Sequence, residues 1–221
     1  MNSLVIVAGG SGSRMKSEIP KQFMDINGKP LILWTIERFR HFDKGMKIIV
    51  VLPENHLIIW QSIMEAHPGF EQVIITTGGA TRYHSVIRGL EHIAGNEIVG
   101  IHDAVRPLVS VETIKRCYDM AKKKHSAIPV VDMEDSLRRI TNSGNEILGR
   151  SRVKRIQTPQ VFQAEKLIIA YEQGLEMNFT DDASVFEAYY GSVKLVEGNQ
   201  ENIKITYPSD LEIATALLGR E

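Results

Sequence analysis

A glycine-rich loop and two cationic side chains lie close together near the N-terminus, directly after a short apolar run. The glycines are Gly9, Gly10 and Gly12, and Arg14 and Lys21 follow them. Closely spaced glycines let backbone N–H groups turn inward as an anion cradle, and the two cations would add positive charge to phosphates held there. No Gly-Lys-Ser or Gly-Lys-Thr follows, so this is not a Walker loop. A glycine-rich turn can be purely structural, but the two cations favour a phosphate site.

A carboxylate and an arginine follow a later apolar run, at Asp103 and Arg106. A carboxylate at the end of a strand can hold a divalent cation beside phosphates, and the arginine can make a bidentate contact to an anion. The structural alternative is that Asp103 caps the following turn and pairs with Arg106. His102 precedes the aspartate, so on a strand it points to the opposite face, where we expect a core or supporting histidine rather than a ligand.

A third cation, Lys204, lies between two isoleucines in a predicted strand at residues 203–206. If the isoleucines face the core, the lysine points the other way, where it could meet a phosphate or simply lie in solvent. Ser209 and Asp210 precede an apolar segment and predict a helix N-cap rather than a ligand site. The acidic helix start at Asp181 is likewise predicted to be a cap.

Alternating strand and helix patterns must position these side chains. Continuous apolar runs, typical of strands buried on both faces of a sheet, lie at residues 4–7, 48–52, 73–75, 98–101 and 127–131. Helix-period segments lie at residues 31–39, 57–66, 82–93 and 111–123. The C-terminal part predicts strands at 160–162, 193–196 and 203–206, helices from 165 and near 183–189, and a terminal helix from 208. This order predicts one α/β domain over 1–221, with a Rossmann-like, doubly wound, mostly parallel sheet whose carboxyl edge binds the ligand.

A basic segment interrupts the alternation at about residues 133–156. The Asn/Gly-rich stretch at 142–145 predicts a hairpin turn, and hence a protruding β-arm. Residues 137–155 hold six basic side chains against Glu146 alone, a local excess of +5. So small an arm has little core of its own, and we expect it to pack on a second subunit.

Composition excludes several classes of protein. The 221 residues carry 26 Lys and Arg against 27 Asp and Glu, so the chain is not a globally basic nucleic-acid binder. The single cysteine, Cys117, allows no internal disulfide and suits a buried helix position. The N-terminal apolar run is too short for a signal peptide or a membrane span. We therefore expect a cytoplasmic protein that binds neither nucleic acid nor membrane.

Taken together, these motifs resemble those of the sugar-phosphate cytidylyltransferases, most closely the 2-C-methyl-D-erythritol 4-phosphate cytidylyltransferases. The resemblance runs in order from Ala8 to the terminal helix. It rests on Ala8-Gly9-Gly10 with Pro20-Lys21-Gln22, His102-Asp103-Ala104-Val105-Arg106-Pro107, Thr158-Pro159-Gln160, Thr180-Asp181, Leu195-Val196-Glu197-Gly198 and Asn202-Ile203-Lys204.

The resemblance implies a role for each matching position. The residues it marks as catalytic cations beside the α-phosphorus of CTP are Arg14, Lys21 and Lys204. Those it marks as binding CTP are Ala8, Gly9, Gly10, Gly12, Gly79, Ser85 and Asp103. Those it marks as binding the polyol phosphate are Asp103, Arg106, Ser136, Arg150 and Thr158. It also implies Mg²⁺ or another divalent cation at Asp103, and a homodimer in which the arm delivers its residues to the partner subunit.

The implied reaction is an in-line attack of the polyol phosphate on the α-phosphorus of CTP, with pyrophosphate leaving. Ala80 and His84 stand where the family often has acidic residues near the cytidine, and Ser136 stands where it usually has threonine. Ribitol-5-phosphate cytidylyltransferase shares nearly every motif and is one alternative. A nucleotide-binding module without catalysis is the other, although it would have no evident need for Arg14, Lys21, Asp103 and Lys204 together.

Overall fold

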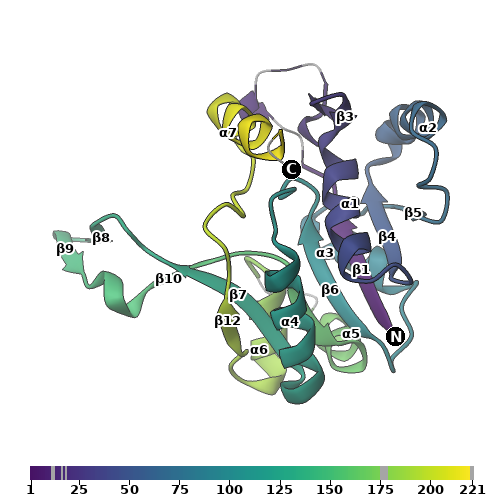
Figure 1. The fold of residues 1–221 in the computed structure, drawn as a ribbon. Coiled ribbons are helices and arrows are strands. Elements are labelled where there is room, and N and C mark those ends of the chain that lie inside the picture. Colours follow the sequence, from purple (N-terminus) through teal and green to yellow (C-terminus); the bar gives the residue numbers. More distant parts are fainter. Residues whose placement is uncertain (11–12, 16, 18, 175–178, 220–221) are drawn as a thin grey trace.

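The structure is a computed structural model that describes residues 1–10, 13–15, 17, 19–174 and 179–219. A central sheet forms the middle layer, and helices cover both of its faces (Figure 1). This arrangement confirms the predicted α/β class with a mostly parallel sheet. No helix in the described part of the chain is long and apolar enough to cross a membrane.

The N-terminal half of the sheet is parallel. Strand β1 (Asn2–Val7) lies between β4 (Lys47–Leu52) and β6 (Ile98–Asp103), and β5 (Ile74–Thr77) adds to the outer side of β4. Val7 is in register with Asp103, so the loops that leave β1 and β6 begin side by side at the carboxyl edge. This register brings the glycine-rich loop next to Asp103.

The C-terminal half is mixed. Strand β11 (Gln160–Gln163) runs antiparallel to both β6 and β7 (Ser126–Asp132). Strand β10 (Lys154–Ile156) is antiparallel to β7, and β12 (Leu195–Glu197) is parallel to it. The strand order is β10-β7-β11-β6-β1-β4-β5, with β12 also on β7. The antiparallel β11 therefore places the segment before it directly against the end of β6.

The helices divide between the two faces because successive strand residues point to opposite sides. On β1, the side chain of Leu4 belongs to one apolar core and that of Val5 to the other. The first core is covered by α1 (Leu31–Phe42), α2 (Leu57–Ala66) and α4 (Val111–Lys124), and Cys117 is buried in it as predicted. The second is covered by α3 (Arg82–Leu90), α5 (Ala164–Gln173) and α6 (Asp182–Tyr190).

Smaller elements complete the fold. A two-stranded ribbon and the terminal helix share a third apolar cluster with the loop after β6. These elements are β2 (Asp25–Ile26), β3 (Lys29–Pro30) and α7 (Pro208–Leu218). Single turns of 3-10 helix are η1 (Ser13–Met15), η2 (Lys21–Phe23), η3 (Glu54–His56) and η4 (Arg150–Arg152).

Two local predictions were wrong. Residues 203–206 form no strand. Ile205 N donates to the Val105 carbonyl oxygen at 3.0 Å, and Ile203 N donates locally to the Glu201 carbonyl oxygen at 2.6 Å. The N-cap of α7 is Tyr207 rather than Ser209 or Asp210. The Asp210 carboxylate instead accepts the N–H groups of Thr206 and Tyr207, each at 2.8 Å, because Pro208 occupies the first helical position.

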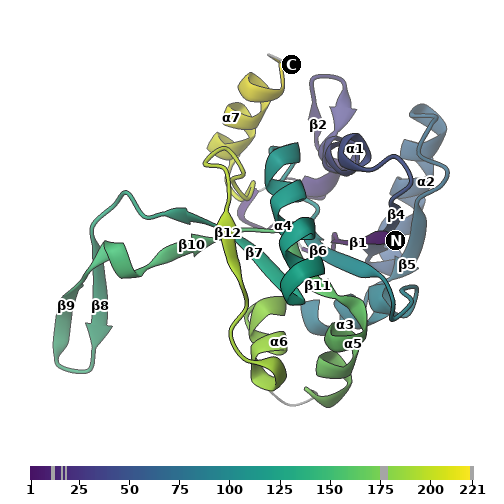
Figure 2. The same ribbon diagram turned by 60° about the horizontal axis from the view of Figure 1, so that its bottom comes forward.

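The predicted β-arm is present as a hairpin of β8 (Leu137–Thr141) and β9 (Gly144–Leu148). It extends away from the three layers in both ribbon views (Figures 1 and 2). Ile140 and Ile147 are 79% and 80% exposed on it. The described part of the chain therefore leaves these two large apolar side chains largely uncovered.

Candidate active site

A cavity of about 470 Å³ opens at the carboxyl edge of the sheet, and a second of about 200 Å³ adjoins it. The larger cavity is lined by the glycine-rich loop, the start of η2 and the segment that precedes α3. The smaller one is lined by the link between β10 and β11 and by the residues before α6. Arg82, Asp103 and Lys204 line both, so two ligands bound here would meet at these three side chains.

The glycine-rich loop is tied to the sheet at its start. Ala8 N donates to the Val51 carbonyl oxygen at 3.0 Å, and the buried Gln22 amide donates to the Ala8 carbonyl oxygen at 2.7 Å. A Cβ atom at Gly10 would lie 3.8 Å from Lys21 Cε, an ordinary contact, so the neighbouring protein atoms do not require glycine there. Absence of a side chain keeps the backbone open to a ligand instead. Gly12, which is also predicted to bind CTP, lies outside the described residues.

Lys21 is held inside the larger cavity. Its side chain is buried, and Nζ donates to the Ile205 carbonyl oxygen at 3.1 Å. Burial lowers the pKa of Lys21, and the positive charges of Lys204 and Arg14 lower it further. Crowded cations of this kind favour an anionic ligand, which would relieve their mutual repulsion.

Arg14 and Lys204 also line the larger cavity. The Arg14 guanidinium lies over the Tyr207 ring, 5.8 Å from its centre. Lys204 points into the site although its segment is not a strand. Its Nζ lies 3.1 Å from Asp103 Oδ2, whereas the neighbouring Ile205 side chain is fully buried. The structure therefore brings together all three cations that the sequence singled out.

The segment before α3 forms the opposite wall of the larger cavity. Gly79 N donates to Ser85 Oγ at 3.2 Å, and Ser85 Oγ donates to the Thr81 carbonyl oxygen at 2.9 Å. A Cβ atom at Gly79 would lie 2.4 Å from His84 Cβ, so this position has no room for a side chain. Gly79, Ser85 and Ala80 line the cavity, as does Thr81, the N-cap of α3.

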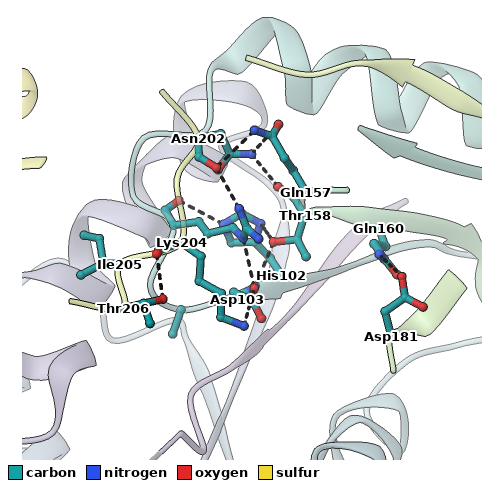
Figure 3. Close-up of polar contacts among 12 residues, drawn as sticks. His102, Asp103, Gln157, Thr158, Gln160, Asp181, Asn202, Lys204, Ile205 and Thr206 are labelled. Atoms are coloured by element: carbon teal, nitrogen blue, oxygen red, sulfur yellow. Dashed lines mark hydrogen bonds and ion pairs between the residues drawn. The ribbon is translucent and has the colours of Figure 1, made fainter. Parts of the chain in front are cut away.

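Asp103 is the electrostatic centre of the site (Figure 3). Its Oδ2 accepts from Arg106 Nε and from Lys204 Nζ, each at 3.1 Å. Burial alone would raise the pKa of Asp103, but Lys204, Arg106 and Arg82 outweigh it and hold that pKa well below the usual range. Asp103 is therefore ionised at any physiological pH. The pairing with Arg106 that the sequence left as an alternative is present within a site that could still bind ligands.

The other face of the β6 terminus is closed by His102, as predicted. The imidazole is fully buried and lies edge-on to Phe39, with ring centres 4.8 Å apart. Its Nδ1 is 2.9 Å from Thr158 Oγ1 and its Nε2 is 3.2 Å from the Arg106 carbonyl oxygen. Burial lowers the pKa of His102 to about 3, so the ring is neutral. Asp103 N also donates to Thr158 Oγ1, at 3.1 Å.

Sequence reasoning missed several buried polar residues that hold the site together. Arg82 donates to both carboxylate oxygens of Asp182, at 3.0 and 2.6 Å, and Tyr171 Oη donates to the same group at 2.6 Å. Burial alone would lower the pKa of Arg82. The negative charge of Asp182 outweighs this effect and raises the pKa of the guanidinium above its ordinary value. Partners 100 residues apart carry no local spacing signal, so no sequence pattern could have paired them.

Asn202 and Gln157 form a second set of contacts that sequence reasoning missed, and they hold the segment that leads to Lys204. Asn202 Nδ2 donates to the Thr158 carbonyl oxygen at 2.9 Å, and Gln157 Nε2 donates to the Asn199 carbonyl oxygen at 2.8 Å. Arg106 Nη1 donates to the Asn202 carbonyl oxygen at 2.8 Å. Gln160 Nε2 donates to Asp181 Oδ2 at 2.9 Å (Figure 3). Asp181 is the N-cap of α6, as predicted.

The donor set suits a hard divalent cation that is shared with a ligand. The described residues include no group of three or more His, Cys, Asp or Glu side chains able to hold a metal. Mg²⁺ is commonly held by one or two carboxylates together with substrate phosphates. Asp103, ionised and lining both cavities, fits that role.

The arm residues are separated from this site within one chain. In the described part of the chain, neither Ser136 nor Arg150 lines either cavity. Both are exposed, and Arg150 Nη1 donates to the Glu134 carbonyl oxygen at 2.6 Å. Of the five residues predicted to bind the polyol phosphate, the structure brings Asp103, Arg106 and Thr158 together around the smaller cavity.

Known proteins of one family match this chain along nearly all of its length. Residues 3–220 match the family model described as IspD: 2-C-methyl-D-erythritol 4-phosphate cytidylyltransferase. The chain is 52% identical to the enzyme of that name from Bacteroides fragilis over 215 residues, which cover 97% of this chain and 98% of the relative. It is 48% identical to that of Bacteroides thetaiotaomicron over 216 residues, covering 98% and 99%.

Solved structures agree. The crystal structure of 4-diphosphocytidyl-2C-methyl-D-erythritol synthase from Anaerococcus prevotii has a TM-score of 0.83 and 29% identity, over 99% of this chain and 96% of that one. The matched family lies on the methylerythritol side of the choice that the sequence left open, and it confirms the predicted class of enzyme. The chain belongs to the 2-C-methyl-D-erythritol 4-phosphate cytidylyltransferase (IspD) family of nucleotidyltransferases.

Proposed function

We propose that this chain transfers CMP from CTP to 2-C-methyl-D-erythritol 4-phosphate at the paired cavities, giving 4-diphosphocytidyl-2-C-methyl-D-erythritol and pyrophosphate for isoprenoid precursor synthesis. Family membership supports the reaction. The observation that carries the assignment of residues is that Arg82, Asp103 and Lys204 line both cavities. A reaction between two phosphates needs a place where both substrates meet positive charge at once. Arg82 and Lys204 supply that charge, and Asp103 lies between the two cavities with them.

CTP occupies the larger cavity in this proposal. The backbone of Ala8, Gly9 and Gly10 approaches the triphosphate, and Gly79 with Ser85 faces the cytidine. Support comes from the cavity lining. Gly12, which lies outside the described residues, remains a predicted CTP-binding residue.

The polyol phosphate occupies the smaller cavity. Arg106 and Lys204 bind its phosphate and orient one oxygen toward the α-phosphorus of CTP. Both cations hold Asp103 at 3.1 Å, which fixes their positions before the substrate arrives. Preorganised charges act without reorganisation at the moment of reaction.

The chemical step is a single displacement. An oxygen of the polyol phosphate forms a bond to the α-phosphorus, the bond from that phosphorus to the bridging oxygen of the β-phosphate breaks, and pyrophosphate carries away the electron pair. A phosphate nucleophile is already ionised and needs no general base. Arg14, Lys21 and Lys204 stabilise the charge that builds on the phosphoryl oxygens.

Asp103 would hold Mg²⁺ or a similar divalent cation beside the phosphates. When bound, such an ion neutralises phosphate charge and helps to orient the triphosphate. The chain's own contribution is to keep this carboxylate ionised among three cations.

The active protein in this proposal is a homodimer. The arm of one subunit delivers Ser136 and Arg150 to the smaller cavity of the other, which explains why these two residues lie away from their own cavities. The exposed isoleucines at the tip of the arm support this pairing. The arm and the sheet form one nucleotidyltransferase domain over 1–221. We place the dimer in the cytoplasm, without nucleic-acid or membrane partners.

Pyrophosphate release tests the proposal. Purified protein is given CTP, Mg²⁺ and either 2-C-methyl-D-erythritol 4-phosphate or ribitol 5-phosphate, side by side. We expect release with the methylerythritol substrate, a much slower reaction with ribitol 5-phosphate, and none after removal of the metal with EDTA. Faster turnover of ribitol 5-phosphate would overturn the substrate assignment. Binding of CTP without any release would indicate a nucleotide-binding module.

A further inference from the structure

We propose that Arg82 is a further catalytic residue, which donates to the phosphates of both substrates where the two cavities meet, and that Asp182 and Tyr171 hold its guanidinium in place. This role rests on the proposed function and adds to it a residue that no sequence motif singled out. Arg82 is the one arginine of the described residues that lines both the larger and the smaller cavity.

A buried carboxylate fixes the guanidinium of Arg82 from behind. Arg82 Nη1 donates to Asp182 Oδ1 at 3.0 Å and Nη2 donates to Oδ2 at 2.6 Å, so the contact is bidentate. The Asp182 side chain is fully buried, and Tyr171 Oη donates to its Oδ1 at 2.6 Å. Two parallel hydrogen bonds fix the plane of a guanidinium as well as its distance. The orientation of Arg82 is therefore set before any ligand binds.

This pairing leaves hydrogen-bond donors for a ligand. A guanidinium has five N–H groups, of which Asp182 takes one from Nη1 and one from Nη2. The other N–H groups of Arg82 have no acceptor within the described part of the chain. The Arg82 side chain is 34% exposed, and it forms part of the wall of each cavity. Its remaining donors can therefore reach phosphate oxygens on either side.

The alternative is that Arg82 only neutralises Asp182. Neutralisation does not require a cation at a cavity wall, as a second buried carboxylate of this chain shows. Lys47 pairs with the buried Glu97 through one contact of 3.3 Å, and it lines neither cavity. A buried ion pair is also no more stabilising than well-packed apolar residues of similar size. The placement of Arg82 where two anionic substrates would meet favours a role in the reaction.

The guanidinium has a task that the lysines of the site cannot perform in the same way. The polyol phosphate and the α-phosphate of CTP are both anions, and they repel each other as they approach. A planar guanidinium can donate to oxygens of two groups at once, whereas an ammonium acts as a point charge. Arg82 holds one oxygen of each phosphate, which offsets the repulsion and stabilises the charge that builds as the new bond forms.

A double variant separates catalysis from stability. Arg82→Gln leaves the buried Asp182 without its cation, so its melting temperature should fall. Combining Arg82→Gln with Asp182→Asn removes both charges and should restore most of the melting temperature. We expect kcat for pyrophosphate release to stay about 100-fold below the parent in both proteins, with KM for each substrate changed less than about five-fold. A folded double variant with parental kcat would overturn the proposal, because neutralisation alone predicts that activity returns with stability.

Asp182→Asn by itself tests the positioning role. This variant keeps Arg82 but weakens its bidentate contact, and kcat should fall about ten-fold with KM for CTP nearly unchanged. Tyr171→Phe removes one hydrogen bond to Asp182 and should lower kcat about three-fold. Neither change should lower kcat further in Arg82→Gln, because both residues act through the guanidinium. Losses that multiply in the combined variants would contradict this positioning role.

A second ion pair of the same region supplies the matched control. Arg88 and Glu91 pair at 3.0 Å at the exposed C-terminal end of α3 and line neither cavity, so Arg88→Gln with Glu91→Gln should keep the parental kcat.

Arg82→Lys decides the question if the double variant does not fold. Lysine still neutralises Asp182 but cannot form the bidentate contact, and we expect kcat about 30-fold below the parent. Parental kcat in Arg82→Lys would overturn the proposal. A parent enzyme that forms no product would overturn the proposed function and this role together. An active parent with an equally active double variant would overturn the role of Arg82 alone.

Discussion

The paired cavities and the β-arm differ in the sequence separation of the residues that contact one another. Around the cavities, side chains far apart in sequence are locked together: Lys21 donates to the Ile205 carbonyl, Arg82 pairs with Asp182, and Lys204 pairs with Asp103. In the arm, contacts are local, as between Arg139 and Glu146 across the hairpin. Contacts within a single folded chain therefore set the geometry of the cavities.

That difference explains where each region can act. Groups at the cavities are buried, so their charges interact strongly and shift the pKa values of Lys21, Arg82 and Asp103. The arm carries its cations in solvent, where such interactions are weak. Its apolar residues Ile140 and Ile147 remain exposed in the single chain. These exposed side chains support the proposal that the arm packs on a second subunit, whereas the contacts around the cavities form within one chain.

Removing the Lys21 ammonium should have the largest effect. Lys21→Ala should lower kcat/KM by about 10³-fold, the scale seen when one preorganised donor is lost from a reacting phosphoryl or acyl group. Steady-state pyrophosphate release measures the loss, and thermal melting checks that the fold is kept. Lys122→Ala, at an exposed position in α4, is the control and should be unaffected. Near-normal turnover in Lys21→Ala would remove this lysine from the mechanism.

The arm should contribute through substrate binding. Arg150→Ala should raise KM for the polyol phosphate by about 30-fold, as expected for the loss of a charge-assisted hydrogen bond, and should change KM for CTP far less. Arg139→Ala, on the same arm but paired with Glu146, is the control.

Mixed dimers then decide whether Arg150 acts across subunits. A dimer of one Lys21→Ala and one Arg150→Ala subunit should contain one intact site if the arm crosses over, and activity should recover to about half of the parental value, since one of two sites is restored. No recovery would mean that Arg150 acts in its own subunit or through stability.

The apolar tip of the arm should matter for assembly alone. Ile147→Ser should weaken dimerisation by about ten-fold, because a partly buried isoleucine contributes on the order of 1.5 kcal/mol at an interface. Analytical ultracentrifugation measures the change. Ile58→Ser, at an isoleucine 78% exposed on α2, should leave assembly unchanged. Equal effects of the two substitutions would show that the arm has no special part in the dimer.

The smallest predicted effect is on pH dependence. Burial, with Lys204 and Arg14 nearby, lowers the pKa of Lys21, so its positive charge is lost at a lower pH than that of an ordinary lysine. Affinity for CTP should therefore begin to fall at an alkaline pH that is below the pKa of an ordinary lysine side chain. Because the folded-state pKa is lowered, protonated Lys21 costs stability at neutral pH, and this cost fades as pH rises through that pKa.

Calorimetric titration of CTP across the alkaline range measures this effect. Lys21→Arg keeps its charge there and should lack the decline. An identical decline in both proteins would assign it to another group.

Local sequence patterns predicted much of the fold and many site residues. Continuous apolar runs gave β1, β4 and β6 to within a residue or two at each end, and the glycine-rich loop with Arg14 and Lys21 followed directly from residue types. Prediction failed at residues 203–206, where alternation of Ile and Lys looks like a strand. One backbone hydrogen bond to Val105 replaces the expected ladder.

Sequence alone determined which residues could do chemistry here, because glycine, lysine, arginine and aspartate have properties that hold in any fold, and it determined the class of fold through periodicity. Tertiary structure decided which of them meet. The register of Val7 with Asp103, the Arg82–Asp182 pair and the hydroxyl of Thr158 behind Asp103 join segments up to 100 residues apart. Such contacts depend on how strands pair and helices pack, and those choices leave no mark on the spacing of neighbouring residues.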